Sequence, residues 1–165
     1  MSGAEAPAKS APRGLDDSGL THLVGYAASR AALEMRKVFS SHMEAFDLRV
    51  AEFTILMLVA GNGDVNQKQL GQALDISPPN MAVTLDRMVG RGWVERVRST
   101  RDRRAQHIHL TVKGRTLAER AHRISTTMEE SALAMLSHAE RALLIELLRK
   151  ISSRTSRAAP ALTRG

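Results

Sequence analysis

Apolar residues near the beginning of the chain recur at steps of three and four, from Leu20 to Phe39. This spacing places them on one face of a helix. Asp17 and Ser18 come just before the stretch, and either side chain can cap the first turn of a helix. The pattern therefore predicts a long amphipathic helix that begins near Leu20.

The last third of the chain predicts two more amphipathic helices. Thr111 can cap a helix whose apolar positions start at Leu117 and continue to Leu133 or Leu136. Ser137, with a glutamate three residues later, forms a capping box in front of a leucine-rich final helix.

The central stretch predicts two short helices joined by a tight turn. Asn66 can cap the first helix, and Gln69 three residues later completes a capping box. The second helix opens with Ser77 as a candidate cap and with Pro78 at the first helical position, where a missing N–H has no cost.

A hairpin is predicted directly after these helices. Residues 92–97 and 106–110 alternate apolar and polar side chains, which is typical of half-buried strands, and residues 98–104 form a charged tip between them. The chain is thus expected to be mainly α-helical with a small β-hairpin wing. This is a winged helix-turn-helix with the order α-α-β-α-α-β-β-α-α.

Positive charge is concentrated on the hairpin and its surroundings. Residues 87–115 carry nine basic side chains against two acidic ones, a net +7 that equals the formal net charge of the whole chain. The remaining residues are neutral on balance. A basic patch confined to one helix and one hairpin indicates binding to duplex nucleic acid.

The second helix of the pair has one face suited to reading base pairs. Met81, Leu85, Met88 and Val89 are expected to hold it to the domain, because they share one side at helical spacing. The opposite side carries four candidates for base contact: Asn80 for adenine, Val83 and Thr84 for a thymine methyl, and Arg87 for guanine or phosphate.

Several motifs resemble the MarR family of bacterial transcription regulators. The most specific are Asp102-Arg103-Arg104 in the wing and the step from Leu110-Thr111 to Gly114. The resemblance covers about residues 20–155, and it also includes residues 53–56, 69–71, 76–81, 85–88 and 91–94. One departure is the helix start at residues 48–50, which lacks the Ser or Thr cap often present in the family.

The resemblance implies that Asp102 braces the wing while Arg103 or Arg104 enters the minor groove, where narrow A·T-rich geometry favours arginine. Arg98 and Arg101 are then expected at phosphates. The predicted DNA-contacting residues are Ser77, Pro78, Asn80, Val83, Thr84, Arg87, Arg98, Arg101, Asp102, Arg103 and Arg104.

The apolar faces of residues 20–43 and 117–151 are larger than a single winged domain can cover, so a second copy of the chain is the expected partner. In the resembled family the first and last helices form the dimer, and a crevice beside them often takes small aromatic or phenolic ligands that lower DNA affinity. The Arg and His side chains near this crevice suit an anionic ligand such as an aromatic carboxylate or an acyl-CoA thioester. The predicted ligand-binding residues are His22, Tyr26, Arg30, His42, Met43, Phe46 and Arg49.

Composition limits the other possibilities. The chain has 165 residues, 43% of them hydrophobic, with no cysteine and no apolar run near the ~20 residues of a membrane helix. We expect flexible tails at residues 1–16 and 156–165. Residues 17–155 are expected to form one domain, with its DNA-binding core at about 48–115. With no secretion signal evident, a cytoplasmic protein is expected.

Other functions have weaker support. His107 and His109 share one face of a strand and can bind a metal, but the chain has no cysteine, and a solvent- or phosphate-facing role is favoured. No nucleophile–base pair or glycine-rich phosphate loop is present, so no enzyme and no cofactor are expected. The main alternative to a sequence-specific regulator is an architectural DNA-binding protein without sequence preference.

Overall fold

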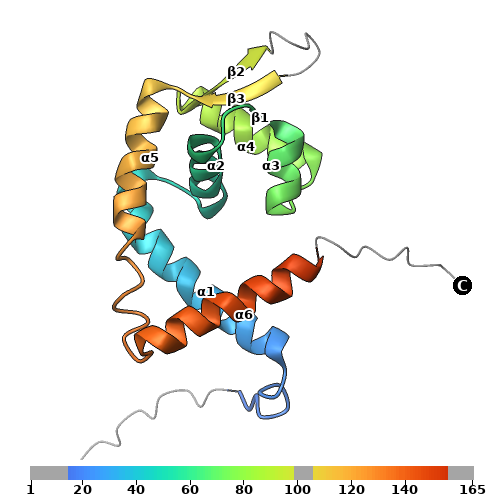
Figure 1. Ribbon diagram of the computed structural model, residues 1–165, viewed down its shortest axis with the longest axis vertical. Helices are drawn as coiled ribbons and strands as arrows, with labels where there is room; N and C mark the ends of the chain where they lie inside the picture. The colour runs from blue at the N-terminus through green and yellow to red at the C-terminus, as the bar shows by residue number, and fades with distance from the viewer. Residues whose placement is uncertain (1–14, 99–105, 156–165) are drawn as a thin grey trace, which may run out of the picture. The chain divides into compact units, whose positions relative to one another are not determined.

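The computed structural model describes residues 15–98 and 106–155 of the 165-residue chain (Figure 1). Its elements follow the order predicted from the sequence, with one added 3₁₀ turn. They are α1 (Val24–Met43), η1 (Glu44–Phe46), α2 (Val50–Gly61), β1 (Val65–Asn66), α3 (Gln67–Leu74), α4 (Pro78–Gly90), β2 (Val94–Arg98), β3 (Gln106–Leu110), α5 (Val112–Ser125) and α6 (His138–Thr155).

The chain divides into two compact units, residues 1–34 and 35–165, and α1 spans the boundary between them. Within the described part of the first unit, turns at residues 18–22 precede the first half of α1. The second unit holds the rest of α1 and every other helix and strand described here.

A three-stranded antiparallel sheet with the order β1-β3-β2 forms the wing. Val94 pairs with Leu110 and Arg98 with Gln106, which fixes the register of the predicted hairpin. The short strand β1 joins the other edge of β3 through the pair Val65–Ile108. The predicted winged helix-turn-helix architecture is confirmed.

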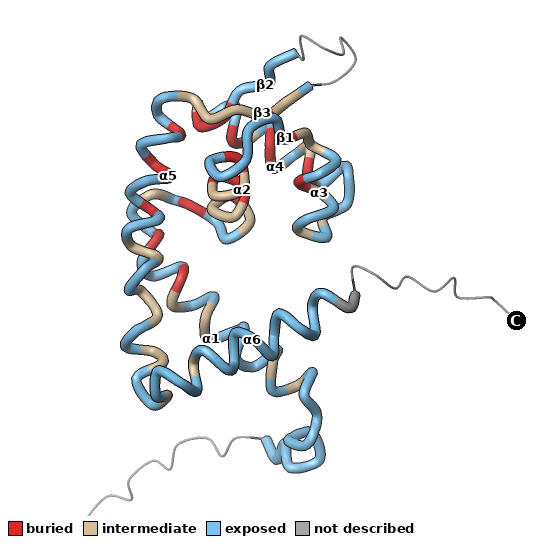
Figure 2. Tube along the Cα trace, in the orientation of Figure 1, coloured by how far each residue is buried: buried red, intermediate tan, exposed pale blue. Residues whose placement is uncertain are grey.

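The hydrophobic core of the second unit lies among α2, α3, α4, α5 and the strands, where the buried residues gather in Figure 2. Ile55 and Leu56 of α2 are fully buried, as are Met81, Leu85 and Met88 of α4. The inward face predicted for the second helix is thus confirmed at these three positions. Val89 is different, since it remains 37% exposed and lies outside the buried core cluster.

Three of the predicted helix starts are confirmed. The Asn66 side chain accepts from the N–H of Gln69 at 2.9 Å, and the Gln69 side chain accepts from the N–H of Asn66 at 2.9 Å. Thr111 Oγ1 accepts from the Gly114 N–H at 3.0 Å at the start of α5. The Ser137–Glu140 capping box opens α6.

The predicted start of the first helix is wrong. The helix begins at Val24 rather than near Leu20, because the preceding residues make short turns: the N–H of Leu20 donates to Asp17 O and that of Leu23 to Leu20 O. The Asp17 carboxylate accepts from the Tyr26 hydroxyl at 2.7 Å and caps no helix.

The predicted length of the helix after the wing is also wrong. α5 ends at Ser125 instead of continuing to Leu133 or Leu136. The hydroxyls of Ser125 and Thr126 donate to the carbonyls of His122 and Arg123, at 2.8 and 2.7 Å. Such local bonds compete with the helix, and turns follow as far as Leu136.

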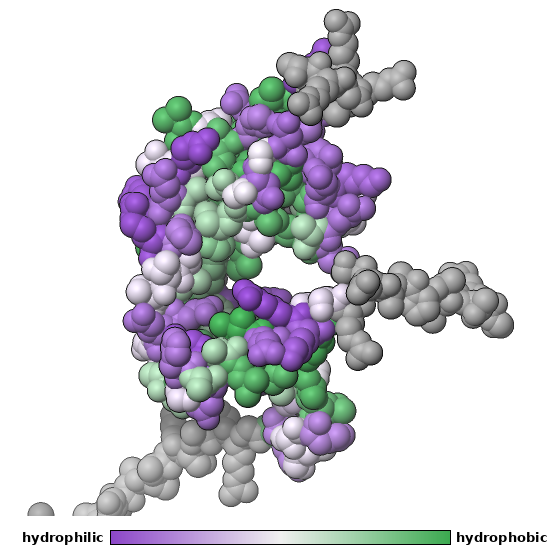
Figure 3. All heavy atoms as spheres, viewed as in Figure 1, coloured by the Kyte–Doolittle hydropathy of each residue, from purple (hydrophilic) through white to green (hydrophobic). Residues whose placement is uncertain are grey.

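Exposed apolar side chains run along α6, which is pale blue in Figure 2. Figure 3 shows apolar residues at the surface along its course. Those exposed by 41–54% are Leu143, Leu144, Ile145, Leu147, Leu148 and Ile151.

Candidate nucleic-acid interface

The helix α4 begins as the sequence predicts, with one difference at its cap. Ser77 occupies the N-cap position and Pro78 the first turn, but the Ser77 side chain makes no capping hydrogen bond. The N–H groups of this end are thus not satisfied by the Ser77 hydroxyl, and a helix N-terminus of this kind attracts phosphate oxygens.

The face of α4 opposite the core presents the side chains predicted for base contact. Val83 is 68% exposed although it is apolar, and Asn80 is also exposed. Thr84 uses its hydroxyl to donate to the Asn80 carbonyl at 2.9 Å. An exposed valine beside a threonine whose hydroxyl is already bonded suits contact with thymine methyl groups.

Arg87, predicted to contact guanine or phosphate, is held by two carboxylates of its own domain in this structure. Its Nη1 lies 3.1 Å from Glu52 Oε1, and its Nη2 lies 3.0 Å from Asp47 Oδ2. The Glu52–Arg87 contact meets the distance of an ion pair without the angle of a hydrogen bond. The guanidinium is therefore directed at the junction between η1 and α2.

Arg91, one helical turn beyond Arg87, binds the same junction. Its Nη1 donates to Asp47 Oδ2 at 2.6 Å and to the Asp47 carbonyl at 2.8 Å, and its Nη2 donates to the Phe46 carbonyl at 3.2 Å. Partial desolvation of the carboxylate works to raise the pKa of Asp47, but the charges and hydrogen bonds of Arg91 and Arg87 outweigh it, so that pKa is lowered.

The two arginines bring together residues that the sequence analysis did not select. Asp47, Glu52 and Arg91 had no place among the predicted site residues. Two signals were available: Glu52 is an acidic residue beside the apolar run 53–60, and Arg87 and Arg91 share one helix face at a spacing of four.

The basic hairpin is linked to α4 by an ion pair between Arg96 Nη2 of β2 and Asp86 Oδ1, at 2.7 Å. Arg98 is exposed at the end of β2, where a phosphate contact is open to it. The predicted contacts Arg101, Asp102, Arg103 and Arg104 lie outside the described residues.

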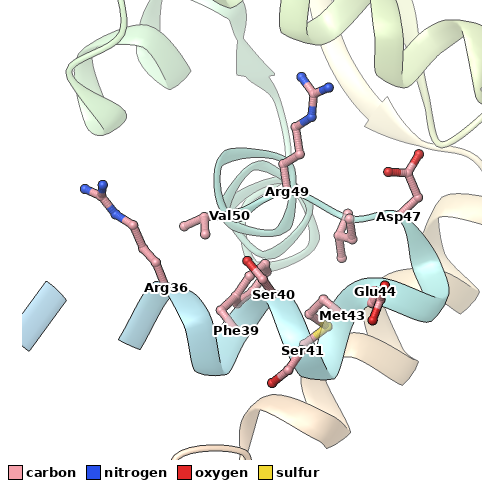
Figure 4. A pocket seen from close by; sticks show the side chains of 10 residues that line it. Arg36, Phe39, Ser40, Ser41, Met43, Glu44, Asp47, Arg49 and Val50 are labelled. Atoms are coloured by element: carbon pink, nitrogen blue, oxygen red, sulfur yellow. The ribbon is translucent and has the colours of Figure 1, made fainter. Parts of the chain in front are cut away.

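The predicted ligand-binding residues of the second unit line two different cavities. Met43 and Arg49 belong to a cavity of about 570 Å³ formed by the end of α1, η1 and the start of α2. In Figure 4, Arg36 and Arg49 extend to the same side of it, and Asp47 lies at the end away from Arg36. Phe39, Met43 and Val50 supply apolar surface, as the cavity's lining shows.

His42 and Phe46 line another cavity, of about 500 Å³, together with Arg120 and Arg123 of α5. The Arg120 guanidinium lies 4.9 Å from the centre of the Phe46 ring, within the range of a cation–π contact.

His22, Tyr26 and Arg30 belong to the first unit. There the hydrogen bond that Tyr26 donates to Asp17 raises the pKa of Tyr26.

The histidine pair of β3 has an acidic neighbour that the sequence did not indicate. His109 Nε2 lies 3.3 Å from Asp64 Oδ1, outside the hairpin. Across residues 15–98 and 106–155, no three His, Asp or Glu side chains gather as a metal site. In the same ranges, no helix combines the length and the apolar character needed to cross a bilayer.

Comparison with known proteins gives consistent matches. Residues 46–105 match the MarR family. The transcriptional repressor CouR bound to a 23-mer DNA duplex superposes with a TM-score of 0.78 and 33% sequence identity, covering 85% of this chain and 99% of that chain. CouR bound to p-coumaroyl-CoA gives a TM-score of 0.76 and 31% identity, over 84% of this chain and 98% of that one. Transcriptional regulator HosA of Escherichia coli O157:H7 is 27% identical over 128 residues, which are 74% of this chain and 95% of HosA.

Proposed function

The chain belongs to the MarR family of DNA-binding transcriptional regulators, and we propose that it is a sequence-specific repressor that a small ligand releases from its operator. The observation that carries this proposal is the outward face of α4, where Asn80, Val83 and Thr84 stand on a helix held rigidly by a buried apolar face. A helix of this kind reads base edges in the major groove, while the basic hairpin contacts the backbone.

The repressor is proposed to act as a homodimer. The aliphatic side chains along α6 remain exposed in the single chain, and a second copy of α6 is the simplest surface to cover them. A two-fold protein reads a pseudo-palindrome, with half-sites about one helical turn, ~10 bp, apart.

Selection from a pool of random duplexes tests the proposed specificity. We expect the enriched sequences to share a pseudo-palindrome that the protein binds far more tightly than random DNA of the same length. Enrichment without a shared sequence would instead identify an architectural DNA-binding protein, whose affinity depends on charge and salt alone.

Two substitutions then separate base contacts from phosphate contacts. Asn80→Ala should cost about 1–3 kcal/mol on the selected duplex and relax preference at particular base pairs. Arg98→Ala should weaken binding to all duplexes alike and reduce the salt dependence. Equal losses on selected and random duplexes for both variants would refute the assignment of α4 as the recognition helix.

The proposed ligand is an anion with an aromatic body, either an aromatic carboxylate or an acyl-CoA thioester. The cavity lined by Arg36 and Arg49 combines guanidinium groups with the exposed side chain of Val50, and the buried side chains of Phe39 and Met43 lie at its base. CouR, which is similar to this chain, has been solved with p-coumaroyl-CoA. The charge and the apolar lining support this ligand class.

Release of the selected duplex can be measured with p-coumaroyl-CoA, p-coumarate and free CoA in parallel. We expect p-coumaroyl-CoA or p-coumarate to release DNA and CoA alone to have no effect. Arg49→Gln should weaken release if the ligand occupies the cavity beside α2, whereas Arg123→Gln should do so if it occupies the cavity beside α5. Release by none of the three compounds would reject this ligand class.

A further inference from the structure

Glu52 is the only buried charged side chain in the described part of the second unit, with 1% of its surface exposed. Its Oε2 accepts from the N–H of Arg49 at 2.9 Å, which is the half of a capping box that the third helical residue supplies at the start of α2. Its Oε1 faces Arg87 Nη1 at 3.1 Å. The carboxylate therefore ties the first turn of α2 to the recognition helix α4.

Asp47 provides a second attachment for the same helix. Its Oδ2 accepts from both Arg87 Nη2 and Arg91 Nη1, at 3.0 and 2.6 Å, so two arginines one helical turn apart converge on one oxygen. We call these four side chains the arginine clamp: Asp47, Glu52, Arg87 and Arg91.

The backbone of Asp47 is adapted to this role. Its φ of 47° and ψ of 47° lie in the left-handed region, which Asp and Asn enter more readily than other residues with a side chain. This conformation lets the Asp47 carbonyl and carboxylate face α4 together, and Arg91 Nη1 binds both. The geometry is specific to an arginine fork, which lysine cannot reproduce.

We propose that the arginine clamp sets the orientation of α4 for base recognition, with Asp47 as a positioning residue and Arg87 acting through the clamp instead of contacting DNA. The inference rests on the proposed function. It also gives the cavity lined by Arg36 and Arg49 a route to the DNA-binding helix, because Asp47 lines that cavity and holds α4.

Electrostatics and positioning predict opposite results for Asp47→Asn. The substitution removes one negative charge beside two arginines, so a purely electrostatic role predicts tighter binding to every duplex. Positioning predicts about tenfold weaker binding to the selected duplex, the loss expected when one base contact fails, with random-duplex affinity unchanged or higher. Asparagine has the same shape and tolerates the left-handed backbone, so the variant tests the charge alone.

Arg87→Lys is a second, independent variant. It keeps the positive charge but cannot contact Glu52 and Asp47 together. The clamp predicts a loss of preference for the selected duplex similar to that of Asp47→Asn. Glu119→Gln on α5 is the matched control, because it removes the same charge as Asp47→Asn from an exposed site outside the clamp and should keep the preference.

Trp93 gives a readout of the clamp without DNA. It is the only tryptophan in the chain, and the Arg91 guanidinium lies 4.0 Å from the centre of its ring. Asp47→Asn removes the carboxylate charge beside Arg91 and leaves it with neutral acceptors, the Asp47 and Phe46 carbonyls among them, so Trp93 emission should change. Glu119→Gln should leave the emission unchanged. A purely local role of Asp47 in the η1 turn would leave the emission unchanged in both variants.

The expected result is a changed Trp93 emission together with a reduced ratio of selected-duplex to random-duplex affinity in Asp47→Asn and Arg87→Lys. If both variants keep the wild-type ratio, the inference is overturned whatever the emission shows. A wild-type protein without preference for any duplex would overturn the proposed function, and the inference with it. Retained preference in the variants overturns the inference alone.

Discussion

Gly114 of α5 lies directly against the backbone of Trp93, so that a Cβ atom at position 114 would come within 1.8 Å of the Trp93 carbonyl oxygen. The neighbouring Thr111 adds to this junction, because its hydroxyl donates to the Gly92 carbonyl at 2.6 Å while it caps α5. The Leu110-Thr111 to Gly114 step, the most family-specific sequence feature in the described residues, thus joins the hairpin to α5.

Gly114→Ala should therefore destabilise the fold by about 3 kcal/mol, at the upper end of typical overpacking, because the obstructing atoms belong to backbone that cannot rotate away. Urea unfolding followed by Trp93 emission measures the change. Gly90→Ala is the matched control: a Cβ there meets nothing within 4 Å, so its stability should be equal or slightly higher. Equal stability of Gly114→Ala and wild type would show that α5 packs differently against the hairpin.

The pair Glu52–Arg87 should behave as a buried ion pair. Glu52→Gln keeps an acceptor for the Arg49 N–H but removes the charge opposite Arg87, and Arg87→Met leaves the Glu52 carboxylate buried without its cation. Each single change should cost about 3 kcal/mol, the lower end for such pairs because the Arg87 side chain is 25% exposed.

The double variant Glu52→Gln/Arg87→Met should cost less than the sum of the two, with a coupling energy of about 1–3 kcal/mol in a double-mutant cycle. Single-variant losses below about 0.5 kcal/mol would place the pair among surface ion pairs.

The elements that sequence analysis predicted correctly depend on local signals. The Asn66–Gln69 box and the Thr111 cap each need only residues three positions apart, and both form as predicted. The alternation in the hairpin and the inward face of α4 are likewise periodic patterns. Local signals failed where short-range hydrogen bonds competed with the helix, as at Ser125 and Thr126.

The arginine clamp shows why part of the site was beyond prediction. Asp47 and Arg91 lie 44 positions apart, and they meet only because α4 packs beside the η1–α2 junction. Helical periodicity placed Arg87 on the same side as Asn80 and Thr84, yet a guanidinium at the end of a long side chain can turn toward either side. Its direction is decided by tertiary partners.

Acid should weaken the fold partly through Asp47. The folded protein lowers the pKa of this carboxyl below its usual value of 3.8, so the charged form contributes stability above about pH 5. This contribution disappears as the pH falls through the folded-state pKa. The stability difference between wild type and Asp47→Asn should thus be largest near neutral pH and shrink toward pH 3, as measured by urea unfolding at a series of pH values.

Glu140 provides an internal comparison, because hydrogen bonds from Ser137 also lower its pKa. Glu140→Gln should remove the part of the pH dependence of stability that comes from Glu140. Its effect on the free energy of unfolding should add to that of Asp47→Asn, because the two carboxylates share no partner. An Asp47→Asn difference that stays constant from pH 7 to pH 3 would show that the ionised carboxylate adds nothing to stability.

The exposed aliphatic face of α6 makes a prediction that links oligomeric state to DNA affinity. Leu144 and Leu148 are one turn apart and are 41% and 45% exposed in the single chain. If a second copy of the chain covers them, Leu144→Asp/Leu148→Asp places two carboxylates in each half of an apolar interface. Full burial of an exposed leucine contributes about 1.5–3 kcal/mol, and less than half of that applies to the surface that these leucines still expose. Because the dimer contains four of them, loss of their burial alone should raise the dissociation constant by about a hundredfold.

Sedimentation equilibrium measures this directly, with wild type near twice the chain mass of 18.0 kDa and the variant near a single chain. Ser153→Asp adds a carboxylate to the same helix about two and a half turns from Leu144, on the opposite side, and should remain dimeric. Because the altered side chains are already exposed, Trp93 emission and urea stability should not change in the monomeric variant at low protein concentration.

The monomeric variant should still bind single half-sites, because α4 and the strands β2 and β3 come from one chain. The wild-type dimer should bind a full pseudo-palindrome more tightly than either half-site alone, because its two binding events are linked. The monomeric variant should lose this gain in affinity. A variant that remains dimeric, or a monomer that binds the full site as tightly as wild type, would show that α6 does not hold the two copies together on DNA.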